Sequence, residues 1–361
     1  MIRSPFRLIL LGDIMIGRLV DQIFAKHVDN REEYEHACML LKRACVQPPV
    51  SYSYIWGNTL DYFHPAYSDL RIGNLETSVT HSNIKWPQKA FNYRCAPENL
   101  QTLKEINLDY VCLANNHTLD YSQQGMNDTM NALNTYQIPF AGVGKNLSEA
   151  RRPAILHRNN TTIGLFSFAD HYSYWAAQPT MPGINYINVE QLTPNDRLQI
   201  KEYISDYQLK NKISLTIVSL HWGSNYQWSP PVAFQLFAHW LIDECHVDII
   251  HGHSSHHVQG IEIYKGKPII YGCGDFIDDY AIDKEYRNDL SFIYLIDMDM
   301  DERKVTKIEL IPTRCTNMQV NELTRNDQDY EWLFSTLARL SAPFGINVQK
   351  INNNNHFIIQ S

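Results

Sequence analysis

A cluster of histidines marks the segment of this sequence whose side chains are best suited to bind a metal ion. Residues 251–257 read HGHSSHH, so four imidazoles lie within seven residues. Neutral imidazole is the commonest side-chain ligand of transition metals, whereas four such rings so close together make poor core filler. The cluster therefore predicts a metal site around His253 and His256.

Four other short segments also carry side chains that bind metals. Carboxylate, amide oxygen and imidazole recur in them, and together these groups suit Zn, Mn or Fe. Each segment alone has a simpler explanation, such as an Asx turn at Asp13, a cap at Glu76 or a core histidine at His221. The segments are Gly12-Asp13, Gly73-Asn74-Leu75-Glu76, Ala114-Asn115-Asn116-His117 and His221-Trp222-Gly223.

The five segments gain specificity from the elements that precede them. Each follows a short apolar run that is typical of a buried strand. In an open α/β sheet, the loops beyond the carboxyl ends of the strands converge on one crevice. The order of the segments therefore predicts one polar site built from five separated loops. The expected strands lie at residues 6–12, 70–73, 110–113, 215–220 and 247–250.

The other elements indicate a mixed α/β fold. Strands that alternate with helices early and pair with each other late imply mixed sheets flanked by helices. Residues 172–200, rich in Pro, Asn and Tyr, are expected to form a long loop over the site. A helix and a hairpin after Thr316 are expected to pack on the same domain, which divides the chain into 1–315 and 316–361. Further helices are expected at 97–106, 122–135, 232–245 and 330–340, and further strands at 163–168, 292–298 and 304–311.

The composition excludes some classes of protein. The 361 residues carry a formal net charge of -8 without a cluster of Lys and Arg, which argues against a nucleic-acid partner. No stretch approaches the ~20 apolar residues of a membrane span. The seven cysteines are scattered, as expected of reduced cysteines in a cytosolic protein. We therefore expect a soluble cytoplasmic protein without a membrane span, and its oligomeric state stays open.

Taken together, the five segments resemble a known family. Similar motifs in the same order are hallmarks of the CapA-type poly-γ-glutamate capsule synthesis family, within the calcineurin-like metallophosphoesterase superfamily. The likeness covers roughly residues 6–312 and implies a four-layer α-β-β-α sandwich of two mixed sheets, with a metallo-dependent phosphatase-like fold. The motifs read GDIM at 12–15, GNLE at 73–76, ANNHTLDY at 114–121, HWG at 221–223 and HGHSSHHVQGIEIYKGKPIIYGCGDFIDDY at 251–280.

The resemblance implies roles for individual residues. His117 would be the general acid that protonates a leaving oxygen, and Asp120 would orient its ring. Arg94 would hold an anionic group of the substrate as a bidentate fork, although a surface ion pair explains this residue equally well. Asn74 and Trp222 would also contact the substrate. The implied ligands of one or two Mn, Fe or Zn ions are Asp13, Glu76, Asn116, His221, His253 and His256.

Three departures from the superfamily pattern bear on the number of metal ions. Met15 stands where the superfamily's Asp-x-His pair has its histidine. Glu76 stands where an aspartate bridges two metals. The final element, from Gly252 to His256, is one residue longer than Gly-His-x-His. Loss of one imidazole leaves open two metals, one metal or none.

Two functions of different classes follow from this pattern. The first is a metal-dependent hydrolase or transferase that acts on a phosphoester or on a polyanionic γ-glutamyl polymer. The second is a non-catalytic accessory or polymer-binding protein with a degenerate metal site. In either case the expected ligand is a small molecule or a polyanionic polymer.

A few other residues carry weaker expectations. Asp275 follows a predicted strand end and could reach the site. Lys85, Lys89 and Arg94 lie close in sequence and could supply a positive patch for an anionic substrate, but the two lysines are expected to be solvated loop charges. Tyr172 and Trp175 could stack on a substrate, or they could pack against the core.

Overall fold

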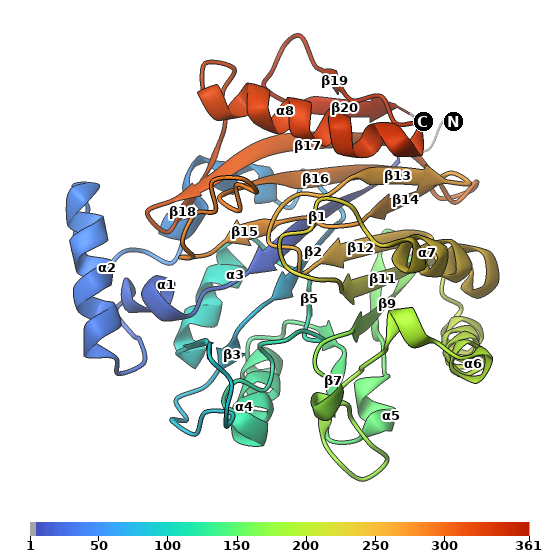
Figure 1. The fold of residues 1–361 in the computed structure, drawn as a ribbon, viewed down its shortest axis with the longest axis horizontal. Coiled ribbons are helices and arrows are strands. Elements are labelled where there is room, and N and C mark those ends of the chain that lie inside the picture. The colour runs from blue at the N-terminus through green and yellow to red at the C-terminus, as the bar shows by residue number, and fades with distance from the viewer. Residues whose placement is uncertain (1–4, 361) are drawn as a thin grey trace.

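The computed structural model describes residues 5–360, and these residues form two large mixed sheets and two small ones (Figure 1). The larger sheet has ten strands within this range. Eight follow one another in a linear order, and the other two lie outside it, with β15 paired to β1 and β18 paired to β17. Its strands in sheet order are β19 (Gln349–Lys350), β20 (Phe357–Gln360), β17 (Lys304–Thr316), β16 (Leu290–Asp299), β1 (Phe6–Ile14), β2 (Leu70–Leu75), β5 (Tyr110–Cys112) and β6 (Phe140–Ala141), with β15 (Asp275–Ile277) and β18 (Gln319–Glu322).

The second large sheet has six strands in the described part of the chain. Its strands in sheet order are β13 (Ile261–Tyr264), β14 (Lys267–Ile270), β12 (Ile249–His253), β11 (Leu215–His221), β9 (Thr161–Ala169) and β8 (Ala154–Arg158). The two-stranded sheets are β3 (Ser78–Val79) with β4 (Arg94–Cys95), and β7 (Val143–Gly144) with β10 (Gly183–Ile184).

Helices connect and cover these sheets. The α-helices are α1 (Arg18–Gln22), α2 (Arg31–Arg43), α3 (Gln101–Glu105), α4 (Ser122–Thr135), α5 (Leu147–Ala150), α6 (Pro194–Asn211), α7 (Val232–Cys245) and α8 (Gln328–Ser341). The 3-10 helices are η1 (Tyr54–Phe63), η2 (Pro97–Leu100), η3 (Ser173–Trp175), η4 (Val189–Gln191) and η5 (Ala342–Phe344).

Two hydrophobic cores hold the layers together. The first contains residues of both large sheets, such as Leu10 and Ile217, and extends to η1, where Trp56 stacks on Phe276 with ring centroids 6.0 Å apart. The second joins the six-stranded sheet to α6 and α7 through residues such as Phe237. Strands covered on both faces read as nearly continuous apolar runs, as β1 does. The predicted α/β fold class of mixed sheets flanked by helices is confirmed.

Most expected elements form, and the differences have local causes. The expected helix at 97–106 is divided into η2 and α3, because Pro97 starts a tight 3-10 turn. The expected loop at 172–200 ends in an unforeseen long helix, α6. Thr193 and Asp196 form a capping box there, with Pro194 in the first turn.

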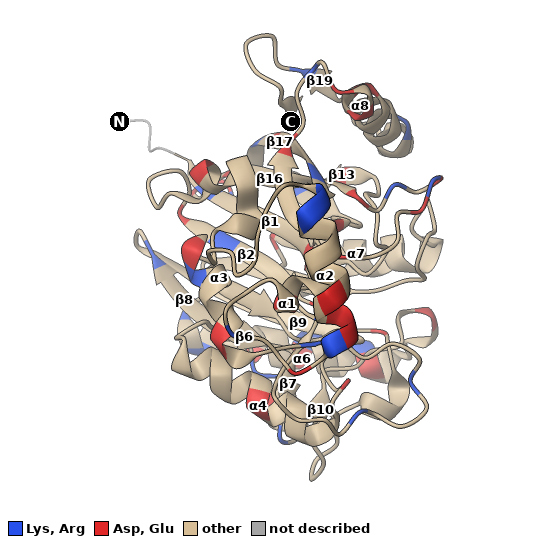
Figure 2. Ribbon diagram, turned by 90° about the vertical axis from the view of Figure 1, so that its left-hand side faces the viewer, with Lys and Arg blue, Asp and Glu red and all other residues tan. Residues whose placement is uncertain are grey.

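The helix α2 was not anticipated either, although its sequence carries the signals. The Asn30 side chain accepts a hydrogen bond from the Glu33 amide 3.2 Å away and so caps the helix. Acidic residues then occupy the first turn, and Lys42 and Arg43 the last (Figure 2). This distribution of charge complements the helix dipole and stabilises the helix.

The C-terminal segment joins the larger sheet. Strand β20 pairs with β17, and the predicted hairpin forms between β19 and β20. The division at residue 315 stays a prediction. Among the helices of residues 5–360, none combines the length and the apolar character needed to cross a membrane.

Candidate metal centre

Three predicted ligands meet where the carboxyl ends of strands from the two large sheets come together. Asp13 lies near the end of β1, His221 ends β11 and His253 ends β12. The Nδ1 atoms of the two histidines are 2.9 Å apart, and His253 Nδ1 is 3.7 Å from Asp13 Oδ1. All three side chains are buried, and one ligand atom of each lies within 4.8 Å of the others. We call Asp13, His221 and His253 the imidazole set.

A second group of ligands shares Asp13 with the first. It adds Glu76, His256 and Asp275, and again one ligand atom of each lies within 4.8 Å of the others. Asp275 reaches this place because β15 runs parallel to β1 and pairs Asp275 with Asp13. His256 Nδ1 lies 3.0 and 3.1 Å from the two oxygens of Asp275. We call Asp13, Glu76, His256 and Asp275 the carboxylate set.

The carboxylates of this second set are buried, and one of them lacks the hydrogen bonds that a buried anion needs. Glu76 is fully buried, and neither of its carboxylate oxygens has a hydrogen-bond partner within residues 5–360. Burial, with the charge of Asp13 next, raises the pKa of Glu76 well above its usual value. Burial likewise raises the pKa of Asp13 to about 6 and that of Asp275 well above the ordinary range. A divalent cation would satisfy these groups, so the residues fit a metal ion.

The histidines of the imidazole set are held in the form that binds metals. Burial is the first cause that lowers the pKa of His221 and of His253 well below the usual value. Both rings are therefore neutral near pH 7, and a neutral ring offers a lone pair to a metal.

A hydrogen-bond relay also fixes which nitrogen of His253 is free. His251 Nε2 donates to the carbonyl oxygen of Leu11 at 2.8 Å, so its Nδ1 must accept from the Ser219 hydroxyl 3.0 Å away. The Ser219 oxygen in turn accepts from His253 Nε2 at 2.9 Å. The Nδ1 lone pair of His253 is left facing Asp13, as expected of a ligand oriented by its neighbours.

The predicted general acid lies beside the same cluster. His117 Nδ1 is 2.6 Å from Asp120 Oδ2, and its Nε2 lies 3.8 Å from Glu76 Oε1. The Tyr93 ring stacks on the imidazole at 4.1 Å, and the Tyr93 amide donates to Asp120 at 2.6 Å. Asp120 therefore holds Nδ1, and the ring directs Nε2 at the ligand cluster.

Lys89 corrects one expectation from the sequence. It was expected to be a solvated loop charge, but only 6% of its side chain is exposed. Its ammonium pairs with Asp120 and lies 3.1 Å from His117 Nδ1. The rings of Tyr172 and Trp175 lie 5.8 and 5.3 Å from it. Burial by these aromatic rings therefore makes Lys89 part of the site.

Comparison with known proteins gives the family. The model of the bacterial capsule synthesis protein PGA_cap matches residues 7–280. This chain belongs to the PGA_cap family. A probable polyglutamine synthesis accessory protein of Mycobacterium tuberculosis is 34% identical over 94% of this chain and 92% of its own length. The PGA biosynthesis protein CapA of Bacillus subtilis is 28% identical over 89% of this chain and 78% of that protein.

Solved structures of low sequence identity were also found. A novel phosphatase of Mycoplasma pneumoniae is 16% identical, covers 88% of this chain and 95% of its own, and has a TM-score of 0.48. The calcineurin-like phosphoesterase YfkN of Bacillus subtilis is 11% identical, covers 88% of each chain and has a TM-score of 0.41.

The asparagines of this PGA_cap chain lie at different depths in the centre. The Asn116 amide oxygen is 3.0 Å from His221 Nε2, at the half-buried edge of the cluster. Asn74 is fully buried and donates to Asp13 Oδ1 at 2.7 Å, and Asn115 donates to Asn74 at 3.0 Å. Asn74 therefore lies behind Asp13 and holds it by this hydrogen bond, and its predicted contact with substrate stays a prediction.

Two other predicted substrate residues lie apart from the ligands. Trp222 packs in the second core, stacked on Phe234 at 5.1 Å, and its indole N–H donates to the Tyr271 carbonyl oxygen at 2.8 Å. Arg94 donates to the carbonyl oxygens of His81 and Ser82 and lines a pocket of about 220 Å³ whose lining includes none of the clustered ligands. The structure brings neither side chain to the centre.

Some functional residues escaped the sequence analysis. Ser219 and Lys89 carry no motif, because their roles depend on contacts with residues far away in the chain. Asp275 was only a possible member, yet it lies 3.0 Å from His256 Nδ1. The alternation of side chains along β11, which puts Ser219 on the same face as His221, is the one signal that could have found Ser219.

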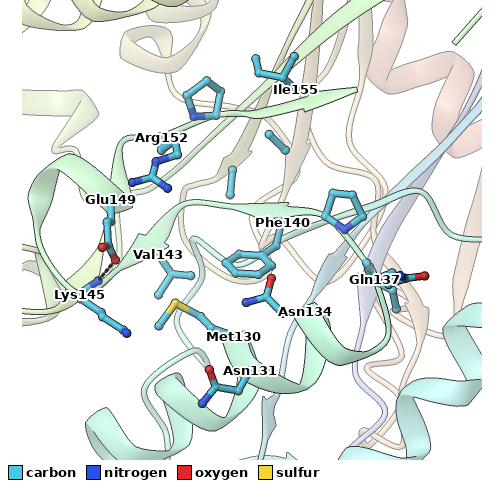
Figure 3. Close-up of a pocket in the computed structure, with 15 residues that line it drawn as sticks. Met130, Asn131, Asn134, Gln137, Phe140, Val143, Lys145, Glu149, Arg152 and Ile155 are labelled. Carbon is cyan, nitrogen blue, oxygen red and sulfur yellow. Dashed lines mark hydrogen bonds between the residues drawn. The ribbon is translucent and has the colours of Figure 1, made fainter. Parts of the chain in front are cut away.

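A groove away from the strand ends carries no such chemistry. It encloses about 580 Å³ between α4, β6, α5 and β8 (Figure 3). Met130, Phe140 and Val143 line its middle, and Lys145 and Arg152 lie along one side. No histidine, cysteine or aspartate is among its described lining residues. The groups able to do chemistry are therefore those at the strand ends.

Proposed function

We propose that this PGA_cap protein is a metal-dependent hydrolase that acts on an anionic phosphoester or γ-glutamyl substrate. One observation carries the proposal: two buried sets of metal ligands share Asp13, and an oriented imidazole, His117, stands beside them. Shared carboxylates are what a centre for one or two closely spaced divalent ions requires. The buried, unpartnered oxygens of Glu76 support the same view.

A divalent ion bound there would supply Lewis acidity and lower the pKa of a bound water. The chain's own groups then have separate tasks. Asp120 accepts from His117 Nδ1 and is itself paired with Lys89, which leaves Nε2 on the side of Glu76. A proton on Nε2 can pass to the oxygen of the leaving group. Asn74 keeps Asp13 oriented by a hydrogen bond of 2.7 Å.

A polar pocket next to the imidazole set would give a substrate access to the ligands. It holds about 350 Å³, and Asp170, His171 and Glu190 are among its lining residues. The His171 ring stands edge-on to His221 with centroids 6.2 Å apart. Since two carboxylates line the pocket and His171 pairs with Asp170 at 3.0 Å, bound metal ions would have to supply the positive charge that an anionic substrate needs against the formal net charge of -8.

A second candidate function is a non-catalytic accessory role in which the protein binds a polymer. The similar mycobacterial protein is named a polyglutamine synthesis accessory protein, and Met15 removes one imidazole from the superfamily pattern. We further propose that the protein works in the cytoplasm, a view supported by seven cysteines that are all free.

Turnover by metal-loaded protein separates the two candidates. Metal-free protein would be reloaded with Zn²⁺ and Mn²⁺ and assayed on bis(p-nitrophenyl) phosphate and on γ-glutamyl-p-nitroanilide. We expect hydrolysis of one substrate that disappears in the His253→Ala/His256→Ala variant. Bound metal without turnover on either class would favour the accessory role.

A further inference from the structure

Asp275 occupies a place that the sequence pattern does not assign. It is 1% exposed, and its carboxylate lies with Asp13, Glu76 and His256 within a 4.8 Å group. Met15, where the superfamily has an imidazole, is fully buried. The thioether of methionine is a soft group that hard cations do not favour. The carboxylate set thus includes Asp275 of β15, in addition to the ligands that the resemblance implies, Asp13, Glu76 and His256.

The backbone explains how Asp275 reaches the end of β1. The Asp13 amide donates to the carbonyl oxygen of Gly274 at 3.0 Å, and the Met15 amide donates to that of Ile277 at 2.9 Å. A Cβ at Gly12 would collide with the Gly274 carbonyl oxygen, so only glycine permits this approach. The segment around Asp275 is thus fixed against β1 by backbone bonds.

The two sets differ in the chemistry of their donors. The imidazole set offers one carboxylate and two rings, whereas the carboxylate set offers three carboxylates and one ring. Imidazole suits Zn and Fe, and carboxylate oxygens suit Mg and Mn. Glu76 gives an independent sign of a missing cation, because both of its buried oxygens lack a partner within residues 5–360. An ion pair between His256 and Asp275 alone would leave Glu76 unsatisfied.

We propose that Asp275 is a metal ligand and that the centre is asymmetric, with a hard cation such as Mn²⁺ in the carboxylate set and Zn²⁺ in the imidazole set. This inference rests on the metal centre of the proposed function, but its test does not depend on turnover.

Competitive metal loading tests the inference directly. Metal-free protein would be incubated with Zn²⁺ and Mn²⁺ together, and its metals counted by mass spectrometry. Because Zn²⁺ binds most sites more tightly than Mn²⁺, Zn²⁺ would be limited to one equivalent and Mn²⁺ kept in excess, and we expect one Zn and one Mn per chain. Asp275→Asn should lose Mn, with an affinity lower by about 100-fold, and keep Zn. His253→Ala should lose Zn.

Asp279→Asn is the matched control. The side chain of Asp279 is also buried, at 1% exposed, but it accepts from the Leu19 amide at 2.8 Å and lies 3.5 Å from Arg18. It belongs to neither set, so its variant should bind both metals like the wild type. Equal loss of Mn in Asp279→Asn and Asp275→Asn would overturn the proposal, because any buried charge would then have the same effect.

Wild-type protein provides a test that needs no variant. Pulsed EPR of the bound Mn²⁺ should detect coupling to one histidine nitrogen. Coupling to two nitrogens, or Zn in both sites with Mn excluded, would overturn the inference. Hydrolysis by a protein with two Zn ions would leave the proposed function standing without the inference. Asymmetric loading without hydrolysis would leave the inference standing without the proposed activity.

Discussion

The two halves of the proposed metal centre differ in how the protein prepares their side chains. In the imidazole set, hydrogen bonds from the protein fix the ligands, since Ser219, His251 and the Leu11 carbonyl oxygen determine the free nitrogen of His253. In the carboxylate set, Glu76 has no hydrogen-bond partner in the described chain, and its pKa is raised by burial. One half is thus organised before a metal binds, and the other is incomplete without one. The comparison shows two separate tasks of the protein: the imidazole set orients its ligands before metal arrives, and the carboxylate set supplies negative charge for the metal to neutralise.

Removal of the shared ligand should have the largest effect. Asp13 belongs to both sets, so Asp13→Ala is expected to abolish binding of both metals and reduce any turnover to background. Metal content by mass spectrometry and activity on the chromogenic substrates would measure this. Retention of one full equivalent of either metal would show that the two sets are independent.

Loss of the general acid should reduce turnover without removing metal. His117→Ala is expected to lower kcat by about 10²–10⁴-fold, because the leaving oxygen loses its proton donor. Both metals should stay bound, since His117 is in neither set. Unchanged kcat on a substrate with a poorly acidic leaving group would remove His117 from the mechanism.

A smaller effect, on metal affinity, should distinguish the imidazole set from the carboxylate set. Ser219→Ala interrupts the relay and is expected to lower Zn²⁺ affinity by about 10–100-fold, while Mn²⁺ affinity stays the same. Titration of each metal, followed by calorimetry, would measure the change. An equal loss of Mn²⁺ affinity would mean that the relay supports the whole centre.

The smallest expected effect is a pH dependence of stability that comes from the carboxylate set. Asp13, Glu76 and Asp275 have raised pKa values in the folded chain, so these three carboxyls bind more protons in the metal-free fold than in the unfolded chain. Their contribution to stability is fully present below the ordinary carboxyl pKa and is lost as the pH rises through about 6, the folded pKa of Asp13. The buried histidines, whose pKa values are lowered, contribute with the opposite sign. Each pKa unit corresponds to about 1.4 kcal/mol.

Thermal unfolding with and without chelator measures this contribution. The melting temperature of metal-free wild type, relative to that of metal-free Asp275→Asn, should fall between pH 4 and about 7, because both proteins keep the buried histidines and differ in one buried carboxyl. Bound metal should remove this relative fall because it replaces the protons. Identical profiles with and without metal would contradict an unsatisfied carboxylate set.

Local sequence patterns predicted much of the fold and the site. The apolar runs before Asp13, Asn116 and His221 became strands, because a strand buried on both faces must be apolar along its length. Polar residues that follow such runs lie at a shared edge, which is why separated motifs converged. The capping box of Thr193 and Asp196 could have revealed α6, because its signal is local.

The residues that escaped prediction depend on distant contacts. Asp275 reaches the centre only because the three-residue strand β15 pairs with β1 at the other end of the chain. Lys89 lies in a polar stretch, and rings from Tyr172 and Trp175 bury it. Trp222 follows a ligand in sequence but points into the second core. Pairing and burial of this kind are set by tertiary structure, which local periodicity does not encode.

Anomalous X-ray diffraction from crystals grown with Zn²⁺ and Mn²⁺ tests the metal centre most directly. Data at the Zn edge should show a peak between Asp13, His221 and His253, and data at the Mn edge a peak between Asp13, Glu76, His256 and Asp275. Both peaks would establish the centre on which the proposed hydrolase depends. Absence of a peak at both places, in crystals that hold the metals elsewhere, would contradict it.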